Sequence, residues 1–244
     1  VTYFGLYALQ HRGQESAGIA VARDGTIEAR KGMGLVGDVL DPATLAQLSG
    51  PIAIGHVRYS TTGSSLLKNA QPFLVSHAGL FLAVAHNGNL TNAHLLRREL
   101  ENKGAIFQST MDSEIFVHLI ARSRKKGYLE RTVDALGRVR GAYSLVLLTE
   151  NALIGARDPR GIRPLCLGEI GESYVLASES CALDLIQARY IRDVDPGEII
   201  IIDKNGIHSE SPFPRVKPAF CIFEYIYFAR PDSNIYGESV YLVR

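Results

Sequence analysis

The sequence predicts an α+β domain built on antiparallel sheets. Many short β-rich runs occupy both ends of the chain, while two helical patterns cluster in its middle. Hairpin-type turns, rather than helices, connect the later runs. This order favours two antiparallel sheets covered by helices over alternating β-α-β units.

The expected strands are short β-rich runs. In chain order they cover residues 18–21, 27–30, 52–57, 81–85, 143–148, 153–156, 174–177 and 198–202. The Asp-Pro-Gly sequence at 195–197 fits a type II turn before the last strand, and the Lys-Asn-Gly sequence at 204–206 fits a hairpin turn after it. These turns support antiparallel pairing near the end of the domain.

Helical spacing is clearest over residues 93–100, with Gly104 just past the end. It recurs over 115–120, where four apolar residues fall on one face. Three prolines between residues 211 and 218 form the one convincing boundary. We therefore expect a domain over residues 1–210, followed by a proline-containing linker that opens the segment 211–244.

The composition is that of an ordinary soluble domain. Of 244 residues, 46% are hydrophobic and 21% are charged. The net charge of +1 gives no sign of the positive surface that binds nucleic acid or anionic lipid. The longest aliphatic run, residues 199–202, is far too short to cross a bilayer. Three cysteines without CxxC spacing argue against a disulfide framework or a self-contained zinc site. We expect a cytoplasmic protein.

One glycine pattern invites a cofactor interpretation that its surroundings do not support. Residues 32–37 match the dinucleotide-binding fingerprint GxGxxG. However, the pair Asp41-Pro42 interrupts the helix that should follow, and no acidic residue stands about twenty positions further on. A glycine-rich strand connection is the better interpretation, so we expect no cofactor within this chain.

The most informative motif is His-Asn-Gly-Asn-Leu at residues 86–90, between an apolar strand and an expected helix. At a strand-to-turn junction, the Asn87 side-chain amide and a backbone N–H at Gly88 can point at one position, as an oxyanion hole requires. Asn-Gly is also the commonest tight-turn dipeptide, so a plain turn is the alternative.

Two charged residues in neighbouring motifs suit a free amino acid. Arg58 follows an expected strand and could hold a carboxylate through a bidentate fork, or pair within the core. Asp112 stands at an expected helix start and could accept from an ammonium group, although capping is the ordinary role of Asp there. Thr61, in a hydroxyl-rich loop, and the pair Arg12-Gly13 complete the candidate binding set, with strand-ending and turn-shaping roles as the alternatives.

Together these motifs resemble the glutaminase domain of the N-terminal-nucleophile (Ntn) amidotransferases and, within that class, the amidophosphoribosyltransferase family of purine synthesis. The segment 223–233 (FEYIYFARPDS) resembles the passage from the glutaminase into the phosphoribosyltransferase domain. Glucosamine-6-phosphate synthases lack this segment and carry Trp where Tyr59 stands and His where Thr62 stands, which favours the purine family. Further similar segments are 10–20, 55–63, 85–92, 157–164 and 177–183.

The resemblance implies a four-layer αββα sandwich that hydrolyses glutamine, with Asn87 and Gly88 as the oxyanion hole. The residues implied to bind the substrate are Arg58, Asp112, Thr61, Arg12 and Gly13. The family's nucleophile is an N-terminal cysteine whose α-amine is the general base, and the alignment places it about fifteen residues before Val1. Residues 1–244 alone are therefore expected to be inactive. Two alternatives stay open: the glutaminase of another Ntn amidotransferase, and a non-catalytic amino-acid-binding module.

The resemblance also implies partners and cofactors outside this chain. Ammonia would pass to phosphoribosyl pyrophosphate in a phosphoribosyltransferase domain entered through residues 211–244, and magnesium is expected only there. Some members bind an iron–sulfur cluster, and Cys221 stands at the position of one ligand, although one thiolate is only a quarter of the usual set. A homo-oligomer is expected, without nucleic-acid or membrane partners.

Overall fold

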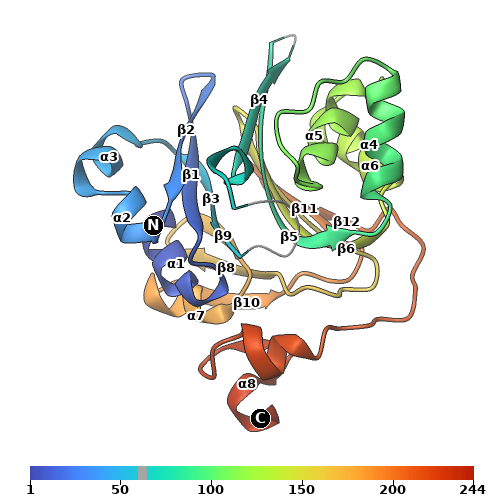
Figure 1. Cartoon of the computed structure of the whole chain (residues 1–244). Coiled ribbons are helices and arrows are strands. Elements are labelled where there is room, and N and C mark those ends of the chain that lie inside the picture. The colour runs from blue at the N-terminus through green and yellow to red at the C-terminus, as the bar shows by residue number, and fades with distance from the viewer. Residues whose placement is uncertain (60–64, 78) are drawn as a thin grey trace.

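Two layers of antiparallel strands face each other, and helices cover the outer side of each layer (Figure 1). This computed structural model describes residues 1–59, 65–77 and 79–244. The predicted α+β class and the αββα layering are confirmed. Within the described ranges, no helix combines the length and the apolar character needed to cross a bilayer.

One layer is a six-stranded antiparallel sheet. In spatial order its strands are β12 (Gly206–Glu210), β11 (Ile199–Asp203), β7 (Ala152–Arg157), β6 (Gly141–Leu148), β5 (Leu80–Leu90) and β4 (Phe73–His77). The helices on its outer face are α4 (Ala93–Asn102), α5 (Ser113–Arg122) and α6 (Tyr128–Leu136). Alternate residues of β5 separate the two faces, because Val84 packs under the helices while Ala83 and Ala85 face the other sheet layer.

The second layer consists of two three-stranded antiparallel sheets, with β1 between β2 and β3, and β8 between β10 and β9. The strands are β1 (Ser16–Arg23), β2 (Thr26–Met33), β3 (Ile52–Arg58), β8 (Cys166–Ile170), β9 (Ser173–Ala177) and β10 (Arg189–Asp193). The helices beside them are α1 (Thr2–Ala8), α2 (Val36–Val39), α3 (Pro42–Gln47) and α7 (Ser180–Leu185). The sequence pattern predicted one sheet here, and in the described residues this layer is divided in two.

The remaining short elements connect these layers or follow them. They are η1 (Gln10–Arg12), η2 (Leu67–Asn69), η3 (Glu224–Phe228), β13 (Asn234–Ile235), β14 (Glu238–Ser239) and α8 (Val240–Val243).

Small side chains line the contact between the two sheet layers. Ala20 and Ala22 of β1 meet Ala83 and Ala85 of β5 in one buried cluster. Alanine lets facing sheets approach more closely than larger side chains would. Beside this cluster a hydrogen bond crosses between the layers, from His56 Nε2 of β3 to the backbone of β5 at 3.2 Å.

The 86–90 motif lies inside a strand, not at the strand-to-turn junction that the sequence predicted. β5 runs through the whole motif and places Asn87 opposite Ser144 of β6. Gly88 has a φ of +154°, and a Cβ atom there would lie 2.1 Å from the carbonyl oxygen of Ala142. The glycine is required by the close approach of β6, so the plain-turn interpretation is wrong.

The sequence pattern missed several short helices and strands. The predicted helices are confirmed as α4 and α5, but α1, α6, α7, β4, β8 and β10 were not predicted. The helix α1 buries only Leu6 and Ala8, which is too little to produce a helical period. The strand β10 contains a register shift and no regular alternation of buried and exposed residues. Local patterns of this kind carry little information about the fold.

The segment after the predicted boundary packs back onto the domain. Residues 211–221 contain no helix or strand and cross to the second sheet layer, orange to red in Figure 1. Glu224 then accepts hydrogen bonds from Arg12 and Arg163, and the Tyr236 hydroxyl donates to the Ile162 carbonyl at 2.7 Å. The division of the chain at residue 210 itself stays a prediction.

Glu114 fixes the loop that leads into α5. Its carboxylate accepts from the backbone N–H groups of Gln108 and Ser109, each at 2.8 Å, and from the Ser109 hydroxyl at 2.6 Å. Burial opposes the charged form, but hydrogen bonds from His118, Ser109 and the two backbone groups outweigh burial and lower the pKa of Glu114 to about 2. The ionised carboxylate therefore stabilises the folded state.

We expect Glu114→Gln to lower the free energy of unfolding by about 1 to 2 kcal/mol at pH 7. Because the pKa of Glu114 is depressed on folding, its contribution is full above pH 4.5, the ordinary value, and is lost as the pH falls toward 2. Urea denaturation at pH 7 and pH 3 checks this, with Glu172→Gln in an exposed turn as the matched control. An effect of Glu114→Gln that is the same at both pH values would contradict the electrostatic explanation.

Candidate functional site

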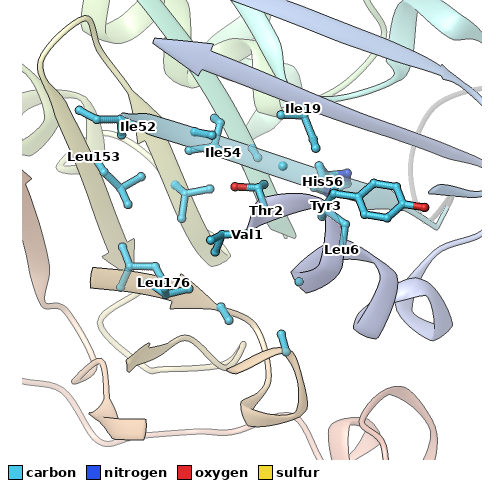
Figure 2. A pocket seen from close by; sticks show the side chains of 18 of the residues that line it. Val1, Thr2, Tyr3, Leu6, Ile19, Ile52, Ile54, His56, Leu153 and Leu176 are labelled. Atoms are coloured by element: carbon cyan, nitrogen blue, oxygen red, sulfur yellow. The ribbon is translucent and has the colours of Figure 1, made fainter. Parts of the chain in front are cut away.

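Two cavities adjoin between the sheet layers, and most of the predicted site residues meet at the smaller one. The smaller cavity has a volume of about 110 Å³, and its lining includes Arg12, Arg58, Asn87, Gly88 and Asp112. The larger cavity, of about 620 Å³, is mainly apolar and lies between β3 and β9 (Figure 2). His56 and Asn87 line both cavities, so they stand where the two meet.

Asn87 offers a buried donor for which the described part of the chain supplies no acceptor. Its Nδ2 atom is shielded from solvent and lacks a hydrogen-bond partner among those residues. Leaving such a group unsatisfied costs about 1 to 3 kcal/mol, so a ligand or a developing charge is the natural acceptor. Gly88, next along β5, lines the same cavity. Both residues of the predicted oxyanion hole therefore line one cavity, and their role there stays a prediction.

Arg58 ends β3 with only 1% of its surface exposed. Its Nη1 atom donates to Glu15 at 2.9 Å, and its Nη2 atom lies 3.5 Å from the sulfur of Met111. Gly13 packs against the Arg58 backbone, because a Cβ atom at Gly13 would lie 2.3 Å from the Arg58 carbonyl carbon. Arg58 thus lines the smaller cavity on a fixed backbone, whereas Gly13 supports it and is not part of the lining.

Asp112 directly precedes α5, yet its side chain makes no capping hydrogen bond to that helix. Its carboxylate instead accepts from the backbone N–H of Leu90 at 2.8 Å and lies 3.7 Å from His86 Nδ1. Burial opposes ionisation, but His86 and the backbone N–H groups outweigh burial and lower the pKa of Asp112. A buried carboxylate that is charged at neutral pH suits an ammonium group.

A serine–histidine pair beside the site was not predicted from the sequence. His86 Nδ1 lies 3.1 Å from the Ser113 hydroxyl, and His86 Nε2 lies 3.4 Å from the Ala142 carbonyl oxygen. With its proton on Nε2 alone, His86 would accept from the serine, as a general base does, whereas stabilisation of the Asp112 carboxylate requires a proton on Nδ1. However, Ser113 has no exposed surface. This favours a role in holding His86 and Asp112 over attack on a substrate.

Arg12 joins the start of the chain to two buried carboxylates. Its guanidinium pairs with Glu179 and with Glu224, the latter at 2.9 Å, and His11 Nε2 lies 2.9 Å from Glu179. Burial alone would raise the pKa of Glu179, but His11 and Arg12 outweigh it and lower that pKa to about 2. Arg12 therefore lines the smaller cavity while its charge is balanced within the protein.

Two further lining residues come from segments to which the sequence analysis gave no site role. Arg163 and Phe228 both line the smaller cavity, and the Arg163 guanidinium carbon lies 4.7 Å from the centre of the Phe228 ring. Arg157 holds this part of the chain by donating from Nε to the Arg163 carbonyl at 2.8 Å. Only the tertiary fold brings positions 163 and 228 together, so no local pattern could have identified them.

No cysteine lines the smaller cavity among the described residues. Cys166 and Cys181 are buried elsewhere, and burial raises the pKa of both thiols, that of Cys181 to about 12. A buried, protonated thiol is a poor nucleophile. The described chain thus supplies donors and charged groups, but no attacking thiolate.

Cys221 does not belong to a metal-binding set within the described ranges. Its sulfur lies 4.0 Å from Arg163 Nη1, a cationic neighbour. Among the described residues, the one group of potential metal ligands that lie close together is His11, Glu179 and Cys181, which does not include Cys221. Glu179 in this group already pairs with Arg12. These residues do not fit an iron–sulfur cluster.

Thr61, in the hydroxyl-rich loop, lies outside the described residues, as does the rest of the 60–64 segment. Tyr59, which precedes this segment, lines the smaller cavity and is 54% exposed.

Known proteins resemble this chain in sequence over most of its length. A family model described as a glutamine amidotransferase domain matches residues 56–185. Amidophosphoribosyltransferase 2 of Arabidopsis thaliana chloroplasts is 50% identical over 241 residues, which are 98% of this chain and 43% of that protein. The amidophosphoribosyltransferase of Bacillus subtilis is 47% identical over 246 residues, covering 100% of this chain and 52% of that protein. The chain therefore spans about half the length of these relatives.

Solved structures show the same fold. The B. subtilis glutamine phosphoribosylpyrophosphate amidotransferase, complexed with ADP and GMP, superimposes with a TM-score of 0.92 and 46% identity over 98% of this chain and 52% of that chain. A glutamine aminotransferase class-II domain protein from Silicibacter pomeroyi gives a TM-score of 0.55 at 14% identity, over 82% of this chain and 92% of that chain. The second likeness concerns the fold alone.

Proposed function

Since this chain belongs to the glutamine amidotransferase family, we propose that it is the glutaminase part of an amidophosphoribosyltransferase, releasing ammonia from glutamine for phosphoribosylamine formation. The relatives that match the chain almost from end to end carry that enzyme's name, which favours it over the glucosamine-6-phosphate synthase type. We further propose that residues 211–244 lead into a phosphoribosyltransferase domain. We expect any magnesium used in the reaction to bind in that domain and not in residues 1–244.

The observation that carries the proposal is the unpartnered Nδ2 atom of Asn87 in the smaller cavity. A glutamine bound there would place its α-carboxylate at Arg58 and its α-ammonium at Asp112. Its side-chain carbonyl would then face Asn87 and Gly88. A non-catalytic amino-acid-binding module could use the same donor to hold the neutral side-chain carbonyl, so the two functions differ in whether removing the donor lowers turnover or only affinity.

In the proposed reaction, the thiol of an N-terminal cysteine gives its proton to its own α-amine while sulfur attacks the side-chain carbonyl carbon of glutamine. Asn87 Nδ2–H and a backbone N–H at Gly88 stabilise the oxyanion. The carbon–nitrogen bond breaks as the α-amine returns the proton to the leaving nitrogen, which gives ammonia and a thioester. Water then hydrolyses the thioester to glutamate and restores the thiol.

We propose that residues preceding Val1 in the parent protein carry this cysteine and occupy the larger cavity. The support is geometric. Consecutive residues 51–56 of the β3 edge and 173–178 of the β9 edge line the cavity, and among the described residues neither edge has a strand partner on that side. Val1 lines it too (Figure 2). An added strand would complete the second sheet layer and end beside Asn87, where the cavities meet.

Glutamine hydrolysis by the full-length protein tests the proposal. We expect glutamate formation when the N-terminal cysteine is free, and none after its replacement by serine or in a polypeptide of residues 1–244. Activity in residues 1–244 above that of the same chain with Asn87→Ala would overturn the mechanism, as would an inactive full-length protein.

Asp112→Asn should raise the KM for glutamine roughly tenfold to a hundredfold and change kcat much less. The substrate ammonium is present from binding onward, so its partner acts on the ground state and the transition state alike. Steady-state kinetics of the full-length protein check this, with exposed Asp184→Asn as the matched control. A fall in kcat at unchanged KM would remove Asp112 from substrate binding.

A further inference from the structure

His56 occupies the boundary between the two cavities, and neither the comparisons nor the sequence motifs give its side chain a role. It lies on β3, two residues before Arg58, and its place in the wall of the larger cavity is seen in Figure 2. Like Asn87, it lines the smaller cavity as well. His56 therefore borders the smaller cavity, which is the proposed substrate site, and also the larger cavity, which the segment carrying the nucleophile is proposed to occupy.

The hydrogen bonds of His56 fix which ring nitrogen carries the proton. Its Nε2 atom lies 3.2 Å from the His86 carbonyl oxygen, which is an acceptor only, so Nε2 must be the donor. In the neutral ring, Nδ1 is then an acceptor. This Nδ1 atom is shielded from solvent and has no partner in the described part of the chain. It requires a donor.

The ring stays neutral over the working pH range. Burial lowers the pKa of His56 to about 4, and the nearby charges of His86 and Arg58 act in the same direction, against the hydrogen bond to the His86 carbonyl, which favours the protonated form. A neutral Nδ1 can therefore accept a hydrogen bond at any pH at which glutamine hydrolysis would proceed. The neutral ring has no positive charge with which to bind the carboxylate of a substrate.

A free α-amine at the boundary between the two cavities could supply the donor that His56 Nδ1 requires. As a neutral base it needs its lone pair directed at the thiol, and its N–H bonds must then be directed elsewhere. After taking up the thiol proton it has three N–H bonds to satisfy in a site shielded from water. Among the described residues that line both cavities, His56 is the one with a buried acceptor, Nδ1, that lacks a hydrogen-bond partner, whereas the unpartnered atom of Asn87 is a donor.

We propose that His56 is a positioning residue: its Nδ1 atom accepts a hydrogen bond from the α-amine of the nucleophilic residue and directs the lone pair of that amine toward the thiol. This rests on the proposed function for the identity of the amine. The α-amine nitrogen belongs to the nucleophilic residue and not to β3. His56 therefore acts on the reaction through this amine and does not contact glutamine.

Two substitutions separate the ring's two hydrogen bonds in the full-length protein. His56→Gln keeps a donor near the Nε2 position and loses the acceptor at Nδ1, whereas His56→Asn keeps an acceptor near Nδ1 and loses the donor to the His86 carbonyl. The first measurement is the pKa of the N-terminal α-amine, read from the pH dependence of its acylation rate. Removing an acceptor destabilises the ammonium form, so we expect this pKa to fall by about one unit in His56→Gln and to be largely retained in His56→Asn.

The second measurement is the kinetics of glutamine hydrolysis. We expect kcat to fall roughly tenfold to a hundredfold in His56→Gln at nearly unchanged KM, with substantial rescue in His56→Asn. Equal amine pKa values in wild type and His56→Gln would overturn the proposal, as would equal losses of kcat in the two variants. The amine titration needs no turnover, so it judges His56 even if wild type fails to hydrolyse glutamine, which would refute the proposed function separately.

Discussion

Replacing Asn87 with alanine is expected to lower kcat for glutamine hydrolysis about a hundredfold in the full-length protein, with little change in KM. The Nδ2 atom of Asn87 is a donor without an acceptor in the described structure, so in the ground state it meets only a neutral amide oxygen. In the tetrahedral intermediate it meets an oxyanion. An interaction that strengthens only as charge develops contributes to turnover and not to binding.

The matched control for Asn87→Ala is Asn89→Ala, the same change two positions along β5 on an exposed residue. We expect its kcat to stay near that of wild type. If Asn87→Ala left kcat intact while lowering the melting temperature, the 86–90 motif would be a structural part of β5 and nothing more.

Arg58→Lys is expected to raise the KM for glutamine by between tenfold and a hundredfold, because an ammonium cannot reproduce a two-pronged contact with a carboxylate. Synthesis of phosphoribosylamine from free ammonia should survive, since that reaction needs no glutamine. Parallel assays with glutamine and with ammonia measure the two effects, and Arg30→Lys on an exposed strand position is the matched control.

The structure also defines how Arg58 could instead be structural. Its guanidinium contacts Glu15 and Met111, so a lysine there could disturb the end of β3. In that case the ammonia-dependent and glutamine-dependent rates would fall together, and the melting temperature with them. A selective loss of the glutamine reaction identifies Arg58 as the carboxylate site.

The site residues were recognisable from the sequence because each stands in a compact local motif. Arg58 ends a β-rich run, Asp112 precedes an apolar helix, and Asn87 stands beside a glycine. Their convergence on one cavity was implied by resemblance to a family and is a property of the fold. The sequence placed Asn87 in a turn, because Asn-Gly most often marks one, whereas pairing with β6 extends the strand and requires the glycine.

Residues that act through long-range packing were out of reach of the sequence. Arg163 and Phe228 meet at the cavity wall although 65 positions separate them in the chain (228 − 163). The importance of His56 depends on which of its nitrogens finds a partner, which only coordinates of β3 and β5 can show. Likewise, the open edges of β3 and β9 cannot be identified from the sequence. An edge is defined by backbone groups that lack a partner strand, and neither strand shows a regular alternation of buried and exposed residues.

The most direct test of the glutaminase site is a crystal structure of the full-length protein after reaction with an electrophilic glutamine analogue that alkylates the nucleophilic cysteine. The account predicts the analogue in the smaller cavity, with its carbonyl oxygen at about 2.7 to 3.1 Å from Asn87 Nδ2 and from the backbone nitrogen at Gly88. Its carboxylate should contact Arg58 and its ammonium Asp112. An analogue bound with its carbonyl oxygen away from Asn87, or attached to a cysteine among residues 1–244, would contradict the account.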